Sequence, residues 1–255
     1  MPSVAAYGPS GELHVVERGS PRRTVFWAED SVSVHRLPAG YGHWLHAAGD
    51  GLLVGLGTQD ERLGLLSYDG RVIARFGRRD PRIAETPFWV FFVRGHAAVA
   101  DGRVFVNSSV DPTIRVYSTS GGSFFAFGTA PSTWVEPTRP DIAAISSPAD
   151  RARIEVWTRT FTVVSGLAGV DGVFVVQCGR HDPRPNASDR AVRRTADVYA
   201  LDDEKLVEGM PINRRLLASG SRLYVLESEP PGAWTVSRAD QAPLSKVAPS
   251  RHGND

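Results

Sequence analysis

The feature of this sequence that most restricts its fold is an internal repeat. Residues 101–128, "DGRVFVNSSVDPTIRVYSTSGGSFFAFG", align without a gap on residues 50–77, "DGLLVGLGTQDERLGLLSYDGRVIARFG". Seven residues of the segment 50–77 are identical at the aligned positions of 101–128: Asp50, Gly51, Asp60, Ser67, Gly70, Phe76 and Gly77. A repeat period of about 50 residues is typical of a chain that stacks copies of one supersecondary unit.

Each copy contains the pattern of four short antiparallel strands. Asp101-Gly102 stands between two apolar runs, and Asp-Gly in this place predicts a tight type I′ hairpin, whose two central residues both have positive φ. The runs "RVFVNSS", "TIRVYS" and "SFFAF" follow, separated by Asp111-Pro112 and by a Gly-centred turn. Four such strands in about 50 residues predict one blade of a β-propeller.

The same pattern extends over most of the chain and predicts a single propeller domain, residues 1–255. Two further copies are less regular, and the N-terminal "VAAYGPSGELHVVERG" matches only the second half of a unit. We therefore expect an outer half-blade at 1–19 and a disordered tail at 242–255. The expected blades are 41–77, 90–128, 161–209 and 214–241, the last with a weak or absent fourth strand. No helical periodicity extends over ten residues, so the expected fold is all-β.

The "DG-strand-break-strand" units, and blade endings such as "YDGRVIARFG", resemble the six-bladed β-propellers of bacteria, the NHL-like and TolB-like group. The resemblance covers most of residues 4–241 and specifies blades rather than a reaction. Complete rings of this group are longer than 255 residues, so it implies an incomplete propeller of about four and a half blades. The group includes lyases, lactonases and binding modules, so the resemblance implies no particular activity.

Composition excludes several classes of function. The net charge is +1, so no overall field favours nucleic acid. No apolar run approaches the ~20 residues of a membrane span. The first thirty residues contain no secretory signal, although a longer parent chain would carry any export signal upstream, which leaves the compartment open. Cys178 is the one cysteine, which excludes an internal disulfide and a cysteine-based zinc site. The P-loop, G-x-S-x-G and H-E-x-x-H motifs are absent.

An arginine-rich insertion is the first candidate site. Ligands of propellers bind beside the channel, on the face formed by the connections between blades and the loops between strands two and three. In the third full unit this loop is twelve residues longer than in the second: 28 residues separate Asp171 from Tyr199, and 16 separate Asp101 from Tyr117. Arginine binds carboxylates and phosphates through paired hydrogen bonds. The candidate ligand-binding residues are Arg180, His181, Arg184, Arg190, Arg193 and Arg194; alternatively, they form a solvated loop.

Two histidines form a second candidate site. His46 and His96 precede their hairpins at nearly the same distance, so both are expected on the innermost strands, where neutral imidazole could bind a divalent metal. His43 is the nearest candidate for a third ligand. Repeat geometry alone also explains why one residue type recurs. Aromatic residues such as Trp44 and Trp134 could line a sugar-stacking surface, or fill the space between blades.

These observations favour a non-enzymatic binding module without a cofactor, which recognises a small anionic ligand or a protein partner through its loop-rich face. The alternative is a propeller enzyme of the lyase or lactonase sort with a divalent metal in the channel. A third possibility is a structural remnant without activity.

Overall fold

The fold comes from a computed structural model of the 255-residue chain. It describes residues 2–8, 10–17, 22–26, 31–37, 45–48, 51–55, 61–78, 95–120, 122–128, 130–140, 146–170, 172–181, 192–202, 205–212, 215–219, 222–228 and 235–238. The expected tail, 242–255, lies outside them. The chain divides into two compact units, Met1–Ser108 with Ile114–Ala126, and Ser109–Thr113 with Phe127–Asp255.

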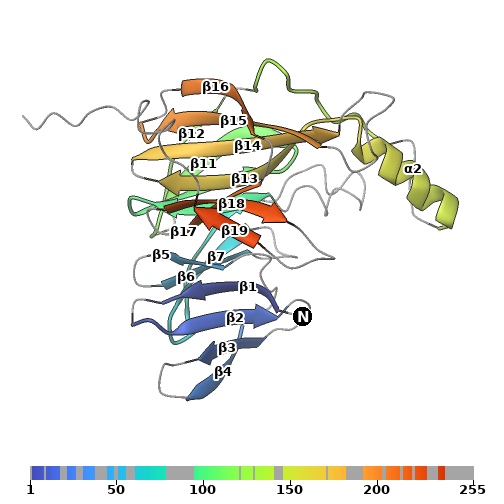
Figure 1. The fold of residues 1–255 in the computed structure, drawn as a ribbon. Coiled ribbons are helices and arrows are strands. Elements are labelled where there is room, and N and C mark those ends of the chain that lie inside the picture. Colours follow the sequence, from blue (N-terminus) through green and yellow to red (C-terminus); the bar gives the residue numbers. More distant parts are fainter. Residues whose placement is uncertain are drawn as a thin grey trace, which may run out of the picture. The chain divides into compact units, whose positions relative to one another are not determined.

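The first unit begins with a complete four-stranded antiparallel sheet, in the order β1-β2-β3-β4 (Figure 1). Its strands are β1 (Pro2–Tyr7), β2 (Leu13–Glu17), β3 (Arg22–Phe26) and β4 (Val32–Arg36). The expectation of an outer half-blade at 1–19 is therefore wrong, because β2 pairs with β3 and is an inner strand of this sheet. A Gly-centred hairpin can join strands one and two as well as strands three and four, so the hairpin pattern did not determine its place in the blade.

The two copies of the repeat form the next two sheets. The second sheet contains β5 (Leu45–Ala48), β6 (Gly51–Gly55), β7 (Glu61–Ser67) and β8 (Val72–Arg78). The third contains β9 (His96–Ala100), β10 (Arg103–Ser108), β11 (Asp111–Ser118) and β12 (Ser123–Phe127). Asp101 and Gly102 have φ values of 50° and 68°, which confirms the predicted type I′ geometry between β9 and β10.

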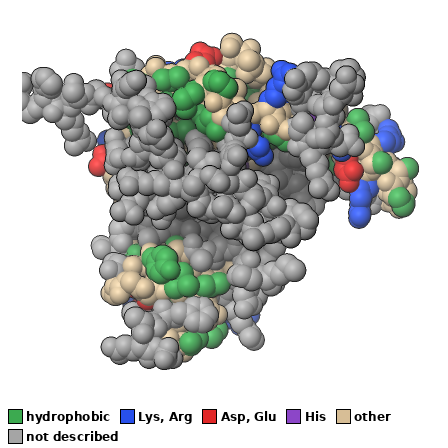
Figure 2. Space-filling model, in the orientation of Figure 1, with side chains coloured by type: hydrophobic (Ala, Val, Ile, Leu, Met, Phe, Trp, Pro, Cys, Tyr) green, Lys and Arg blue, Asp and Glu red, His purple; other side chains and the backbone are tan. Residues whose placement is uncertain are grey.

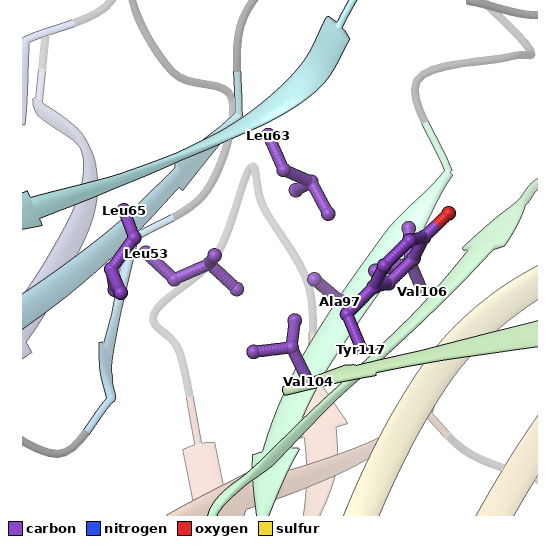
Figure 3. Close-up of a cluster of buried hydrophobic side chains, with 7 residues drawn as sticks. All are labelled: Leu53, Leu63, Leu65, Ala97, Val104, Val106 and Tyr117. Carbon is purple, nitrogen blue, oxygen red and sulfur yellow. The ribbon is translucent and has the colours of Figure 1, made fainter. Parts of the chain in front are cut away.

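The sheets of this unit pack face to face through their apolar residues. Strand β5 lies against both β1 and β9, so the first strands of successive sheets are neighbours, as they are in a propeller. Side chains of the second and third sheets meet in one buried cluster (Figure 3). Its members are Leu53, Leu63, Leu65, Ala97, Val104, Val106 and Tyr117. Burial of this apolar surface is the main force that holds the two blades together.

The second unit contains two more sheets. The first has the strands β13 (Val163–Val170), β14 (Val173–His181), β15 (Val192–Ala200) and β16 (Lys205–Ile212). The other has β17 (Arg215–Ser219), β18 (Arg222–Ser228) and β19 (Thr235–Arg238). Strand β13 lies against β17, which repeats the packing of first strands. The chain is thus an all-β propeller fold of antiparallel blades, as predicted; the six-bladed type stays a prediction.

A helix in the second unit is the exception to the all-β pattern. Helix α2 (Pro148–Thr158) has Ser147 as its N-cap and no buried residue. Figure 1 shows it projecting from the β13–β16 sheet, and Figure 2 shows basic, acidic and hydrophobic side chains mixed on it. The indole N–H of Trp157 donates to the carbonyl of Thr138 at 2.9 Å, and its ring packs on Phe161. The absence of helical periodicity in the sequence is consistent with this helix, which caps and one tryptophan hold without an apolar face.

We expect Ser147→Ala to open helix α2 locally. The Ser147 hydroxyl accepts from the Asp150 N–H at 3.1 Å, and losing such a cap costs about 1 kcal/mol of helix stability. Hydrogen exchange of residues 151–158 should accelerate roughly fivefold, and Ser147→Asn, which keeps an acceptor, should not accelerate it. Hydrogen bonds from Ser146 and Ser147 lower the pKa of Asp150. The ionised Asp150 therefore stabilises the start of the helix at pH values above the ordinary aspartate pKa, and this stabilisation is lost as the pH falls through the lower pKa of the folded chain. Unchanged exchange in Ser147→Ala would contradict the capping role.

No helix among the described residues is long and apolar enough to cross a membrane.

Candidate anion-binding site

The second unit contains a cavity of about 530 Å³. One side is the segment 132–135, the wall segment, which belongs to the connection between β12 and β13. The other side is the end of β14, at residues 178–181, and the start of β15, at Arg193 and Thr195. The cavity therefore lies between a blade-to-blade connection and a strand two to strand three hairpin, which are the two kinds of loop that line the ligand face of a propeller.

Strand register places two arginines side by side at the cavity. Arg180 of β14 is directly opposite Arg193 of β15, and Cys178 is opposite Thr195. Residues that are opposite in an antiparallel pair share a face, so all four side chains belong to one face of the sheet. Like charges in this position repel each other. An anion between the two guanidinium groups would turn this repulsion into attraction.

Two residues that line the cavity each carry a buried donor atom with no hydrogen-bond partner among the described residues. These atoms are the Nε atom of Arg180 and the indole Nε1 atom of Trp134. A buried donor without an acceptor costs about 1–3 kcal/mol, so such groups generally have a bound partner or a functional reason. Both atoms can only donate. The missing partner is therefore an acceptor, such as a carboxylate, a phosphate or a hydroxyl oxygen.

Hydrogen bonds hold the wall segment in place. The Val135 N–H donates to Thr162 Oγ1 at 3.1 Å, and the Thr162 N–H donates to the Val135 carbonyl at 3.0 Å. The Ser132 N–H donates to Glu208 Oε1 at 2.9 Å, which connects the segment to β16. The Trp134 N–H closes a turn on the Pro131 carbonyl at 2.8 Å. Trp134 is thus positioned by the backbone on both sides of it.

The described lining of the cavity contains basic side chains and no carboxylate. Arg180, His181 and Arg193 line it, and no Asp or Glu is among its described lining residues. Asp197 belongs to the same face of β15 but is already neutralised, because its Oδ2 lies 3.3 Å from Lys205 Nζ and its Oδ1 accepts from the Gly209 N–H at 2.8 Å. On the face shown in Figure 2, basic and hydrophobic side chains lie next to one another over β14–β16.

Cys178 gives the cavity a neutral surface rather than a nucleophile. Burial raises the pKa of its thiol to about 12, the charge of Asp197 adds to this effect, and Lys205 opposes it. The thiolate is the reactive form of cysteine. At neutral pH the thiol therefore stays protonated.

The structure brings together three of the six expected ligand-binding residues. Arg180, His181 and Arg193 line the cavity. Arg194 is opposite Gly179, on the other face of the sheet, because successive residues of a strand alternate between faces. Arg184 and Arg190 lie outside the described residues, and their role stays a prediction.

Sequence reasoning missed most of the other side of the cavity. Trp134 was considered only as one of several aromatic residues, and Thr162 and Thr195 were not considered. Nothing in the sequence connects Val135 to Thr162, because an insertion containing helix α2 separates them and their contact is made by the fold. Because successive residues of a strand point to opposite faces, Arg193 and Arg194 were predictable as residues of different faces. Only the register shows which of them shares a face with Arg180.

The two candidate metal ligands lie on neighbouring strands. His46 belongs to β5 and His96 to β9, and these strands lie against each other. His96 is half-buried and is opposite Asn107. Across the ranges that the structure describes, no group of three or more His, Cys, Asp or Glu side chains is arranged to hold a metal ion. His43 lies outside these ranges, and the metal site stays a prediction.

Similarity to known proteins is limited to structure. No family model matches the chain, and no curated protein sequence matches it. Virginiamycin B lyase from Staphylococcus aureus is similar in structure, with 11% identity, a TM-score of 0.45, and coverage of 88% of this chain and 76% of that one. The dihydro-heme d1 dehydrogenase NirN gives 14% identity and a TM-score of 0.45 (87% and 41% coverage). A chain of the nidogen/laminin complex gives 11% and 0.43 (88% and 71%). These proteins include enzymes and a protein complex, so the similarities leave the function open.

Proposed function

We propose that this chain is a non-enzymatic binding module that holds a small anionic ligand in the cavity of its second unit. Arg180 and Arg193 are the anion-binding residues, and Trp134 supplies a further donor from the wall segment. A carboxylate on the side chain of a protein partner has the same chemistry and is the alternative source of the anion.

The observation that carries the proposal is the buried Nε atom of Arg180, which has no acceptor among the residues that the structure describes. It is a donor of a permanently charged group, placed opposite a second guanidinium in the strand register. An anion with two oxygen atoms would satisfy this donor and would also separate the two positive charges.

The non-enzymatic part of the proposal is supported by the chemistry of the lining. The Cys178 thiol is protonated at neutral pH, since burial raises its pKa to about 12. No carboxylate is among the lining residues that the structure describes. This set is suited to holding an anion more than to transferring protons.

Removing the charge of Arg180 is the direct test. We expect Arg180→Met to weaken binding of acetate and inorganic phosphate roughly 10- to 100-fold, because a hydrogen bond to a charged group contributes about 1.5–3 kcal/mol. Arg193→Met should act in the same direction. Isothermal titration calorimetry at low and at moderate salt gives the affinities.

The matched control is Arg194→Met, which removes the same charge from the other face of the same strand. It should leave anion binding within about twofold, since screening weakens its effect on the cavity. If Arg180→Met and Arg194→Met weakened anion binding equally, the effect would be one of net charge alone. The assignment of the anion to this cavity would then be wrong.

A further inference from the structure

We infer that the anion is carried on a hydroxylated ring, so that the ligand class is an anionic sugar of about one ring. This inference rests on the proposed function, because it names the rest of a ligand whose charged group binds Arg180 and Arg193. The charged group itself is a carboxylate or a phosphate.

The size of the cavity indicates a ligand that is larger than its charged group, with further atoms that form the body of the molecule. A volume of about 530 Å³ is within the usual range for pockets that enclose an organic molecule, about 300–1,000 Å³. A bare inorganic anion would leave most of this space to water. The arginines occupy the β14–β15 side, so the body of the ligand would extend towards the wall segment.

Trp134 offers two kinds of contact to that body. Its indole is a flat apolar surface, against which the C–H face of a sugar ring can pack. Its buried Nε1–H has no acceptor in the described part of the chain, and an oxygen atom of the ligand would supply one. A ring that is apolar on its face and bears oxygen atoms at its edge satisfies both requirements.

The hydroxyl groups around the cavity distinguish a sugar from an aromatic acid. Four lining residues carry a hydroxyl: Ser132, Thr133, Thr162 and Thr195. Thr162 Oγ1 accepts from the Val135 N–H, and a hydroxyl that accepts can also donate its own hydrogen. An aromatic acid would displace water from these groups without replacing its hydrogen bonds, which lowers affinity. The hydroxyls of a sugar can replace them.

The test compares small probes in calorimetry with the 255-residue chain. Glucuronate and glucose 6-phosphate provide the two forms of anion on a sugar ring; acetate and inorganic phosphate provide the anion alone, glucose the ring alone, and benzoate an apolar ring with a carboxylate. We expect at least one anionic sugar to bind tenfold or more tightly than every other probe. The preferred anionic sugar identifies the charged group as a carboxylate or a phosphate.

A variant separates the hydroxyl contacts from the anion contact. Thr195→Val keeps the shape of the side chain and removes its hydroxyl, so it should weaken binding of the preferred sugar about fivefold more than it weakens binding of inorganic phosphate. The indole N–H signal of Trp134, assigned by its absence in Trp134→Phe, should shift in the NMR spectrum when the sugar binds.

The outcomes are distinct for the two proposals. If phosphate or acetate binds through Arg180 but neither anionic sugar binds more tightly, or if benzoate binds best, the sugar inference is wrong and the anion site stands. If no anion binds the wild-type chain, both are wrong.

Discussion

Replacing Asp197 with alanine should lower the free energy of unfolding by about 3 kcal/mol. Asp197 is 2% exposed, and its carboxylate lies 3.3 Å from Lys205 Nζ and accepts from the Gly209 N–H at 2.8 Å. Removing one partner of a buried pair costs about 3–5 kcal/mol, because the other charge is left buried. The lower value applies because the Lys205 side chain is 20% exposed and can be partly rehydrated.

Urea denaturation of the wild type and the variant measures this difference. Asp202→Ala is the control, since Asp202 is exposed in the following turn and its loss should change the free energy by less than about 0.5 kcal/mol. Adding Lys205→Met to Asp197→Ala should recover part of the loss, because Lys205 then keeps only the longer contact with Glu208 Oε2 at 3.9 Å, and the substitution removes its poorly compensated charge. A change of less than 1 kcal/mol in Asp197→Ala would contradict the structural role of this pair.

The second large effect concerns the reactivity of Cys178. A thiol whose pKa is about 12 has roughly a thousandfold less thiolate at pH 8 than a thiol with the ordinary pKa of about 8.5. We therefore expect the native chain to react with a disulfide reagent at least about 10³-fold more slowly than the urea-unfolded chain. Since Cys178 is the one cysteine, the signal needs no assignment, and Cys178→Ser should abolish it.

The pH dependence of the reaction rate of Cys178 provides a second test of the raised pKa. A raised pKa means that the thiolate fraction of the native chain should still increase tenfold per pH unit at pH 9–10. A thiol with the ordinary pKa would already have reached a plateau there. A plateau near pH 9 in the folded chain would show that the thiol is not held protonated by its surroundings.

The blades were predictable because their determinants are local. The Asp101-Gly102 hairpin requires positive φ at both residues, and the apolar alternation of each strand follows from the pleat. The first sheet was predicted incorrectly because one hairpin resembles another, and only pairing with β3 and β4 distinguishes an inner pair of strands from an outer one. Helix α2 was missed because its stabilisation comes from a cap and from Trp157, whose partner Thr138 lies outside the helix.

The candidate site, too, was predictable from the sequence only where its determinants are local. The arginine-rich insertion was visible as extra length and charge between two strands of a repeat. Which of its arginines share a face depends on the β14–β15 register, which places Arg180 and Arg193 together and Arg194 on the opposite face. The other side of the cavity depends on hydrogen bonds between residues that are distant in the sequence, such as Val135 and Thr162.

By itself, the sequence determined that this chain forms short antiparallel strands in repeated units and that basic residues gather at one hairpin, because turn chemistry, strand period and charge are properties of neighbouring residues. The tertiary structure alone decided which donors are buried without an acceptor and which side chains face a common cavity. Burial and strand register are set by packing between segments that are far apart in the chain, and no local pattern records them.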